Sequence, residues 1–369
     1  MSDSPSPASI RPVVAVVGAT GLVGRTMIQV LTERAFPMRE LRAFASERSA
    51  GSTLTVGDVT VTVEEARAEA FDGVDIALFS AGGSVSRRLA PEAAARDCVV
   101  IDNSSAWRME PGIPLVVADV NDDDAALHEG IIANPNCSTM QLMPLFKALR
   151  DSVGLERAIV DTYQAVGGTG EKAIRELQAQ IEAHAAGRPK EVAVYPHPIA
   201  FNALPEIDVF LENGYTKEEW KVVTESRKIL HLPDLPVSCT AVRVPVFVGH
   251  SEAVHVETRD PMTPDQARAL FSGVQGVVVV DEPSAHRYPL ATVAAGTDDV
   301  YVGRVRADAS RSDGRGLAFW VVADNLRKGA ATNAVQIAEL LLRNAWIRKA
   351  SERGERTAAA AGAASGARV

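Results

Sequence analysis

Residues 13–24 read V-V-A-V-V-G-A-T-G-L-V-G, and this stretch decides the fold of the first half of the chain. The β-branched run at 13–17 predicts a buried strand, and apolar residues at helical spacing predict a helix from Val23 to Ala35. Between them, Gly18 allows a tight turn, Gly21 lets backbone amides approach a pyrophosphate, and Gly24 permits close packing of the helix on the strand. The amides at the helix start favour an anion. The stretch predicts dinucleotide binding, and a purely steric turn is the alternative.

A polar segment that follows the glycines bears on the choice of cofactor. Arg48, with Ser46 and Ser49, would suit the 2′-phosphate of NADP. Glu47 could instead accept hydrogen bonds from the ribose hydroxyls of NAD. The alternative to both is an ordinary surface turn that binds no cofactor. We favour NADP(H).

The composition limits the class of protein. The chain has 369 residues, enough for two domains or three, and 46% hydrophobic with 23% charged residues is the balance of a globular protein. No apolar run approaches the roughly 18 residues of a membrane span, so no membrane partner is expected. A net charge of -9 argues against nucleic acid as a partner. Three cysteines cannot all pair within one chain, which favours a reducing cytoplasm.

The order of apolar and amphipathic segments predicts two kinds of domain. In the first half, short apolar runs alternate with helical stretches such as 84–95, as expected of a parallel sheet covered on both faces. The second half has longer strands, and its alternating valines predict a half-buried antiparallel strand over 238–248. An apolar helix over 330–347 is expected to return to the first domain. The other predicted strands are 41–45, 74–79, 99–101, 158–164, 253–258, 276–280 and 316–323.

A cysteine at a predicted helix start is the candidate nucleophile. Residues 134–139 read N-P-N-C-S-T, and the helix is expected to begin near Ser138. Backbone amides and the positive helix end would favour the thiolate of Cys137, and the same amides could hold an oxyanion. A buried structural thiol is the alternative, and it suits Cys98 and Cys239 beside apolar runs.

A thiolate needs an acid/base partner, and His250 has the best setting of the seven histidines because it follows Gly249 at the end of a predicted strand. Arg243 lies on the same strand, where strict alternation would place it on the face opposite His250. Both residues can reach one site only if Pro245 or Gly249 bends the chain. A surface arginine and a loop histidine are the alternative. No histidines and cysteines have metal-ligand spacing, so no metal is expected.

Three further polar segments have no role that their pattern alone assigns. Gln164 ends a predicted strand before a glycine-rich turn at 167–170, and residues 102–108 read D-N-S-S-A-W-R. Residues 218–221 read E-E-W-K and open a predicted helix, where they would ordinarily form a solvated face.

In combination, these motifs resemble the aspartate-β-semialdehyde dehydrogenase family over residues 13 to about 347. The resemblance is carried by G-A-T-G-L-V-G, D-N-S-S-A-W-R, N-P-N-C-S-T, T-Y-Q-A-V, R-V-P-V-F-V-G-H and D-N-L-R-K-G-A-A, the last at 324–331. One departure is Gly167 with Thr169, where family members often carry V-S-G-A-G.

The resemblance implies an α/β fold with the architecture of glyceraldehyde-3-phosphate dehydrogenase. A Rossmann-type NADP-binding domain would comprise 12–135 plus 327–350, and an α+β catalytic and dimerisation domain would comprise 136–326. A disordered arm at 1–11 and a low-complexity tail at 351–369 would flank them. The implied reaction is NADPH-dependent reduction of β-aspartyl phosphate to aspartate β-semialdehyde by a cytoplasmic homodimer, in lysine, methionine, threonine and diaminopimelate synthesis.

The resemblance also implies roles for individual residues. Cys137 would form the acyl thioester, His250 would be the general acid/base, and Gln164 would orient the acyl group. Arg243 would bind the substrate α-carboxylate, with Glu219 at its amino group and Asn136 nearby. The implied phosphate site comprises Arg108, Lys221 and Asn103, and the implied cofactor contacts are Gly18, Thr20, Gly21, Leu22, Val23, Gly24, Ser46, Arg48, Ser49, Gly167, Gly168 and Asn325.

Three alternatives compete with this interpretation. N-acetyl-γ-glutamyl-phosphate reductase also makes a semialdehyde from an acyl phosphate through a cysteine, although the segments at 134–139 and 243–250 look less like it. A nucleotide-binding regulator without catalysis would be expected to lack Cys137 or His250. A cysteine hydrolase would act on acyl substrates with no nucleotide.

Overall fold

The computed structural model describes residues 11–347, and the chain divides into two compact units. Unit 1 comprises Met1–Asn134 and Asn333–Val369, of which 11–134 and 333–347 are described, and unit 2 is Pro135–Thr332. The sequence placed these divisions after residues 135 and 326. Apart from Arg11, the expected arm and tail lie outside the described residues.

Unit 1 contains a seven-stranded sheet whose strand order is β3-β4-β2-β1-β5-β6-β7. Every neighbouring pair is parallel except β3 with β4, which form an antiparallel hairpin. The central strands are fully buried, so each reads as a continuous apolar run rather than an alternating one. The strands are β1 Val13–Val17, β2 Glu40–Ala45, β3 Thr53–Val56, β4 Val59–Glu65, β5 Ile76–Phe79, β6 Val99–Asp102 and β7 Ile131–Ala133.

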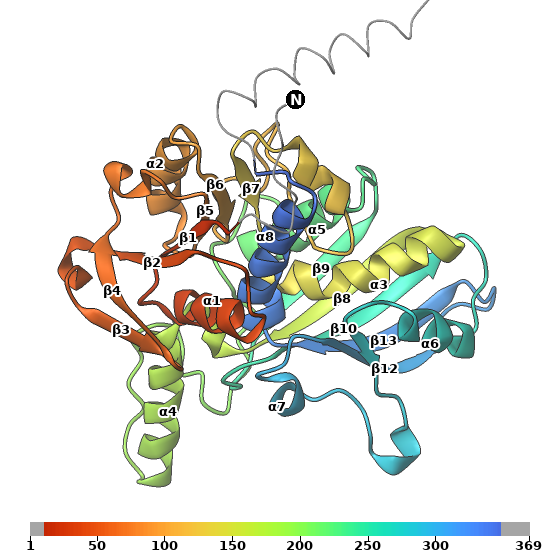
Figure 1. The fold of residues 1–369 in the computed structure, drawn as a ribbon. Coiled ribbons are helices and arrows are strands. Elements are labelled where there is room, and N and C mark those ends of the chain that lie inside the picture. Colours follow the sequence, from red (N-terminus) through yellow and green to blue (C-terminus); the bar gives the residue numbers. More distant parts are fainter. Residues whose placement is uncertain (1–10, 348–369) are drawn as a thin grey trace, which may run out of the picture. The chain divides into compact units, whose positions relative to one another are not determined.

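The described part of unit 1 contains three α-helices: α1 Leu22–Glu33, α2 Gly83–Ala94 and α8 Asn333–Arg343 (Figure 1). The buried face of α1 carries Met27, Ile28 and Leu31 at helical spacing. The core of the unit holds Phe71, which stacks on Phe79 and meets Phe44 edge to face. The predicted strand at 13–17 and the helix that follows it are therefore confirmed.

The helix expected at 330–347 returns to unit 1 but is shorter than predicted. Residues Arg327–Thr332 form a π-helical turn that belongs to unit 2, and α8 begins only at Asn333. Asn333 accepts a hydrogen bond from Ala118 N at 3.0 Å and donates to Val116 O at 2.9 Å, which fixes the start of α8 in unit 1. The wider π turn arises where the chain passes between units, a feature that apolar periodicity does not reveal.

Unit 2 contains a six-stranded sheet whose strand order is β11-β12-β13-β10-β8-β9. β10 pairs antiparallel with both β13 and β8, whereas β9 pairs parallel with β8. Helix α3 packs on β8, β10 and β13, and α5 packs on β9 (Figure 1). The strands are β8 Leu155–Gln164, β9 Val237–Arg243, β10 His250–Thr258, β11 Val277–Val279, β12 Val300–Ala307 and β13 Gly316–Ala323.

The single antiparallel strand predicted over 238–248 is wrong. β9 ends at Arg243 and pairs parallel with β8, and an irregular segment leads from it to His250 at the start of β10. Pro245 has no amide hydrogen for a sheet, and Gly249 has a φ of +98°, so the chain bends here despite its alternating valines. The bend that Arg243 and His250 needed to reach one site is present.

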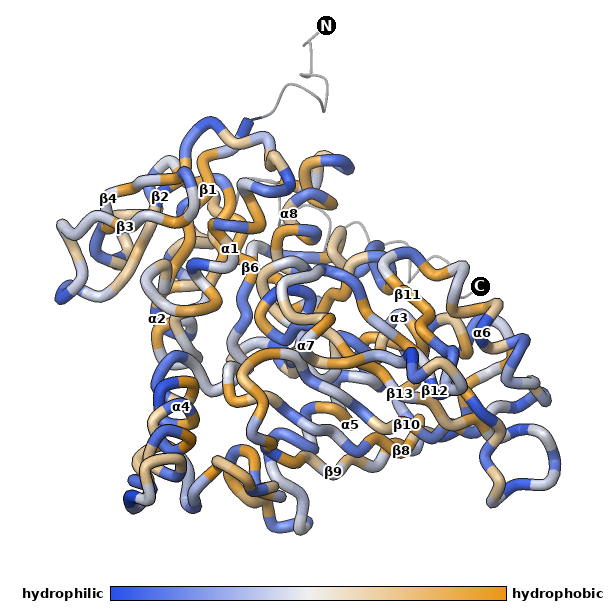
Figure 2. Tube along the Cα trace, turned by 90° about the horizontal axis from the view of Figure 1, so that it is seen from below, coloured by the Kyte–Doolittle hydropathy of each residue, from blue (hydrophilic) through white to orange (hydrophobic). Residues whose placement is uncertain are grey.

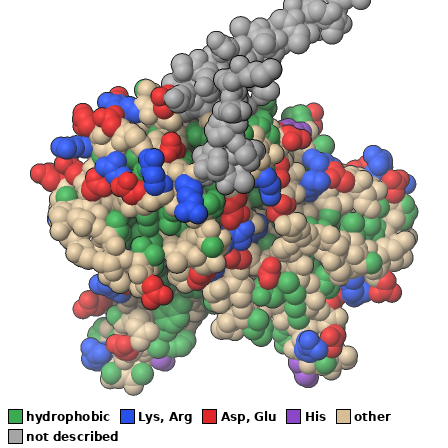
Figure 3. Space-filling model, viewed as in Figure 1, with side chains coloured by type: hydrophobic (Ala, Val, Ile, Leu, Met, Phe, Trp, Pro, Cys, Tyr) green, Lys and Arg blue, Asp and Glu red, His purple; other side chains and the backbone are tan. Residues whose placement is uncertain are grey.

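The helices of unit 2 are α3 Cys137–Val153, α4 Glu171–Ala185, α5 Lys217–Ile229, α6 Pro264–Ser272 and α7 Ala291–Ala294. Hydrophobic and hydrophilic residues alternate along α4 (Figure 2), whose apolar side includes the buried Leu177. On the face drawn in Figure 3, positive and negative side chains are interspersed rather than gathered by sign. Among the described residues, no helix combines the length and the apolar character needed to cross a membrane.

Candidate active site

The glycine turn of unit 1 is shaped by contacts that exclude side chains. A Cβ at Gly18, where φ is +85°, would lie 2.7 Å from Ser80 O, and a Cβ at Gly24 would overlap Gly18 O. Helix α1 begins at Leu22 after Gly21, which supplies no side-chain cap, so its first amides are available to an anion. A cavity of about 520 Å³ opens at this turn and is lined by Gly18, Thr20 and Gly21. The loop fits the pyrophosphate of a dinucleotide.

The lining of this cavity carries both signs of charge. Ser46 and Glu47 line it from the turn after β2, and Arg88 lines it from α2. Arg48 and Ser49 belong to the same short 3₁₀ turn as Glu47 but do not line the cavity, and Arg48 is exposed. These residues accommodate a nicotinamide dinucleotide without deciding between NAD and NADP.

A second polar cluster of unit 1 follows β6. The buried Arg108 donates from Nε to Asn134 O at 3.0 Å and from Nη2 to Asn103 O at 2.7 Å. Asn103 accepts from Asn134 Nδ2 at 2.5 Å, while its own Nδ2 has no hydrogen-bond partner. The cluster therefore presents a fixed guanidinium and a buried amide donor, groups that suit an anion.

In unit 2, Cys137 and His250 are brought together as the sequence predicted. Cys137 is the first residue of α3 and is partly buried, and His250 is the fully buried first residue of β10. The distance from Cys137 Sγ to His250 Nε2 is 3.3 Å. Gly329 lies against the cysteine, where a Cβ would come within 2.8 Å of Cys137 Cβ. Cys98 and Cys239 are both buried, as expected of structural thiols.

The tautomer of His250 follows from its second ring nitrogen. Ala165 N–H donates to His250 Nδ1 at 3.1 Å. A backbone amide can only donate, so the neutral imidazole carries its hydrogen on Nε2, the atom that faces Cys137 Sγ. His250 is therefore placed to donate a hydrogen bond to a thiolate or to an oxygen bound near the sulfur.

Burial and the positive charge of Arg243 lower the pKa of His250 to about 3, and Glu218 opposes them. Arg243 ends β9 beside Gln164 at the end of β8, and its Nη1 donates to Ala165 O at 2.7 Å. Its Nε is buried and has no hydrogen-bond partner. Burial and the arginine together thus keep the imidazole neutral, and the arginine also offers a donor for an anionic ligand.

Glu218, to which the sequence pattern assigned no role, contacts Gln164, Asn136 and Lys221. Glu218 Oε1 accepts from Asn136 Nδ2 at 2.8 Å and from Gln164 Nε2 at 3.2 Å, and its Oε2 lies 3.0 Å from Lys221 Nζ. Burial would raise the pKa of Glu218, but Lys221, Asn136 and Arg243 outweigh it and hold the pKa at about 2. Lys221 also contacts Asp208 at 3.1 Å. Glu218 is a buried carboxylate at the centre of this group.

Glu219, which the resemblance assigns to the substrate's amino group, lies in the N-terminal cap of α5. Glu219 Oε2 accepts Thr216 N at 2.6 Å in a capping box, and Oε1 accepts Ala241 N at 2.9 Å. Both oxygens are therefore engaged with the backbone. Glu218 and Lys221 lie three residues apart on one face of α5, a helical spacing that could have distinguished the two glutamates.

The two glycines after Gln164 lie against the same group. A Cβ at Gly168 would come within 3.4 Å of the His250 ring and 3.6 Å of Arg243 Nη1. A Cβ at Gly167 would lie 2.7 Å from Phe247 O and 3.8 Å from Asn325 Nδ2, a buried amide with no hydrogen-bond partner. Asn325 accepts Gly249 N at 2.9 Å through its Oδ1. Across residues 11–347, no group of three or more metal-ligating side chains is present.

A strand–turn–helix that fits a dinucleotide and a cysteine facing a neutral histidine together define an oxidoreductase that works through a thiol. Comparison with known proteins agrees with this class. Residues 13–128 match the NAD binding domain of semialdehyde dehydrogenases, and residues 144–328 match their dimerisation domain.

Relatives with high identity extend over most of the chain. The aspartate-semialdehyde dehydrogenase of Aquifex aeolicus is 53% identical over 90% of this chain and 99% of its own length, and that of Legionella pneumophila is 54% identical over 89% and 95%. A crystal structure of aspartate semialdehyde dehydrogenase II from Vibrio cholerae, complexed with ASA, has a TM-score of 0.88 and 48% identity over 91% of this chain and 99% of that one. The chain belongs to the aspartate-semialdehyde dehydrogenase family.

The lowered pKa of His250 predicts a pH-dependent loss of stability. The ordinary value is 6.5 and the folded value is about 3, so below pH 6.5 the unfolded chain takes up a proton that the folded chain refuses. His250 should therefore contribute a fall in the free energy of unfolding that steepens below pH 6.5 to about 1.4 kcal/mol per pH unit near pH 4.5. His250→Gln should remove this contribution. Glu218 acts mainly below this window, where stability is lost as the pH falls from its ordinary 4.5 towards about 2.

Urea unfolding followed by circular dichroism at several pH values measures this slope. His197→Gln is the matched control because His197 is an exposed histidine of the same unit, and it should retain the wild-type slope. Equal slopes for the wild type and His250→Gln would contradict a neutral buried imidazole.

Proposed function

We propose that this chain catalyses the NADPH-dependent reductive dephosphorylation of β-aspartyl phosphate to aspartate β-semialdehyde. The observation that carries the proposal is the 3.3 Å contact between Cys137 Sγ and His250 Nε2 at the start of α3. Membership of the family and the ASA complex of the Vibrio cholerae relative support the substrate. The reaction would serve lysine, methionine, threonine and diaminopimelate synthesis in the cytoplasm, where free cysteines stay reduced.

Two opposite charges beside the cysteine suit the two charges of an α-amino acid. The buried Arg243 would bind the α-carboxylate through its guanidinium. Glu218, a carboxylate with a pKa of about 2, would bind the α-ammonium group in place of Glu219. Gln164 and Asn136 contact Glu218 and would orient the acyl group between these charges.

In the first chemical step, the thiolate of Cys137 attacks the acyl carbon, the bond to the phosphate oxygen breaks, and a thioester forms. Arg108, Asn103 and Lys221 are the residues we propose for the leaving phosphate. The positive end of α3 and His250 Nε2–H stabilise the thiolate beforehand. His250 needs to give up no proton in this step.

The nicotinamide cofactor supplies a hydride to the thioester carbon when it is bound. His250 Nε2–H and the first amides of α3 stabilise the oxyanion that results. Collapse of this oxyanion breaks the carbon–sulfur bond, releases the aldehyde and restores the thiolate. His250 Nε2–H then again donates a hydrogen bond to the thiolate. The predicted acid/base role of His250 thereby narrows to that of a donor at Nε2.

For the cofactor, we propose Gly18, Thr20, Gly21, Leu22, Val23, Gly24, Ser46, Arg48 and Ser49 in unit 1 and Gly167, Gly168 and Asn325 in unit 2. The cradle at Gly18 and Gly24 and the unpartnered Nδ2 of Asn325 support these assignments. We also propose a homodimer, because residues 144–328 match a dimerisation domain.

Removal of the nucleophile provides the first test. Cys137→Ala should lower turnover of aspartate β-semialdehyde with NADP and phosphate by about 10³-fold or more, because no thioester can form. Binding of NADPH, followed by fluorescence titration, should stay near wild type. Cys239→Ala, which changes a buried thiol of the same unit, is the control. Unchanged turnover in Cys137→Ala would exclude the mechanism, and turnover only with N-acetylglutamate γ-semialdehyde would exclude the substrate.

The two neighbouring glutamates should respond differently to the same substitution. Glu218→Gln should raise KM for aspartate β-semialdehyde by about tenfold or more, because it removes the charge opposite the ammonium group. Glu219→Gln should instead lower the melting temperature, because one backbone amide loses its acceptor. Steady-state kinetics and thermal unfolding of both variants measure this. A KM effect confined to Glu219→Gln would restore the original assignment.

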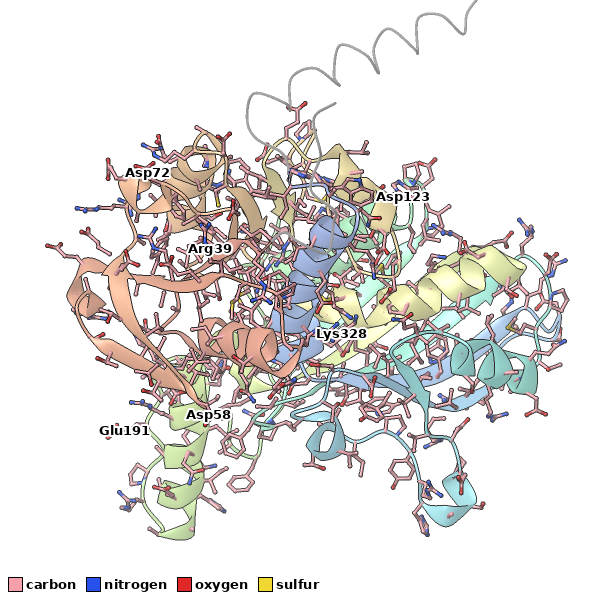
Figure 4. The ribbon with its side chains drawn as sticks, in the orientation of Figure 1. Arg39, Asp58, Asp72, Asp123, Glu191 and Lys328 are labelled. Carbon is pink, nitrogen blue, oxygen red and sulfur yellow. The ribbon has the colours of Figure 1, made fainter. Side chains whose placement is uncertain are left out.

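The preference for NADP is tested at Arg48. Arg48→Ala should raise KM for NADP by about tenfold and leave KM for NAD nearly unchanged, because only NADP carries the 2′-phosphate. Arg39→Ala is the matched control, since Arg39 (Figure 4) is an exposed arginine of the same unit. It does not belong to the residues that line the cavity. Equal effects of Arg48→Ala on both cofactors would refute the contact.

A further inference from the structure

Glu252 is a buried acid for which the proposed mechanism has no use. Its side chain is 0% exposed, and neither carboxyl oxygen has a hydrogen-bond partner. No lysine, arginine or histidine among residues 11–347 forms an ion pair with it. Burying an ionised carboxylate without a partner would lower the stability of the fold by several kcal/mol, so the side chain is expected to be protonated.

Glu252 lies on the same strand as the active-site histidine. It follows His250 by two residues on β10, so the two side chains share the face of the sheet that α3 covers. Its neighbour across the strand pair is Thr162 on β8, whose Oγ1 accepts Gln164 Nε2 at 3.3 Å. Glu252 is thus a neighbour of His250 along β10 and, through Thr162, of Gln164 on β8.

Gln141 occupies the corresponding place on the helix. It follows Cys137 by four residues on α3, the spacing that puts two side chains on one helix face. Gln141 is 1% exposed, and its Nε2 has no hydrogen-bond partner. Gln141 and Glu252 thus follow Cys137 and His250 along the same helix and the same strand, and we call these two buried residues the deeper pair.

Electrostatics agree with this arrangement. Burial raises the pKa of Glu252 well above its ordinary value, the nearby amide of Gln141 opposes the rise, and the negative charge of Glu218 adds to it. A protonated carboxyl and an amide can each donate to the other, so the contact can close without a charge.

We propose that Glu252 is a positioning residue that, carrying a proton, pairs with Gln141 and holds α3 against β10 at the separation that the Cys137–His250 contact requires. The inference rests on the proposed function of that pair. A shift of about 1 Å between reacting groups can cost two orders of magnitude in rate, so the deeper contact has a direct effect on turnover.

The experiment compares variants that keep or remove the pairing. Glu252→Leu keeps the side-chain volume and should lower kcat at least tenfold with little change in KM, while Glu252→Gln, which can still pair with Gln141, should recover most of that loss. Gln141→Leu should match Glu252→Leu, and the double variant should be no worse than either single one, because the pair acts as a unit. If Glu252→Leu does not fold, Gln141→Leu tests the same contact from the helix.

A second readout needs no substrate. The rate at which iodoacetamide alkylates Cys137 should fall in Glu252→Leu and recover in Glu252→Gln, so this measurement stands even if the proposed substrate is wrong. Thr258→Val is the control, because it removes a buried hydroxyl from the same face of β10 far along the strand from His250; it should leave kcat and alkylation unchanged. Wild-type kcat and alkylation in Glu252→Leu and Gln141→Leu, equal losses in Glu252→Gln and Glu252→Leu, or multiplying losses in the double variant would each overturn the proposal.

Discussion

The contact between Cys137 Sγ and His250 Nε2 is the constraint on which the rest of unit 2 depends. It requires a helix and a strand to begin at these two residues, although 113 positions separate them in the chain. The chain reaches His250 only by leaving β9 after Arg243 and turning at Gly249, where a Cβ would lie 2.9 Å from Ala291 O and φ is +98°. A short irregular segment thus places the His250 imidazole beside the nucleophile.

Charge around this contact is arranged so that the histidine stays neutral while its neighbours stay charged. Burial alone would neutralise every group, yet Glu218 is kept ionised by Lys221, Asn136 and Arg243, and Arg243 in turn disfavours a proton on His250. In a buried site these interactions are stronger than in water. The net charge of -9 conceals them, because the useful charges are few, paired and hidden from solvent.

The sequence predicted those features whose chemistry is local. The turn at Gly18 and the strand and helix around it depend on neighbours within a dozen residues, and so do the helix start at Cys137 and the setting of His250. The end of β9 was missed because alternating valines continue past Pro245, while parallel pairing with β8 is a property of the sheet. The resemblance pointed to Glu219, and pattern alone could not distinguish it from Glu218 because it does not say which side of α5 faces the site.

The positions of Glu252 and Gln141 on a strand and a helix explain why the sequence did not predict the deeper pair. Glu252 follows His250 with the period of a strand, and Gln141 follows Cys137 with the period of a helix, so the two periods differ and no linear motif joins them. Only the packing of α3 on β10 makes the two offsets coincide. A catalytic pair held between a helix and a strand needs a support that spans the same two elements, and buried polar groups supply it with a direction that apolar packing lacks.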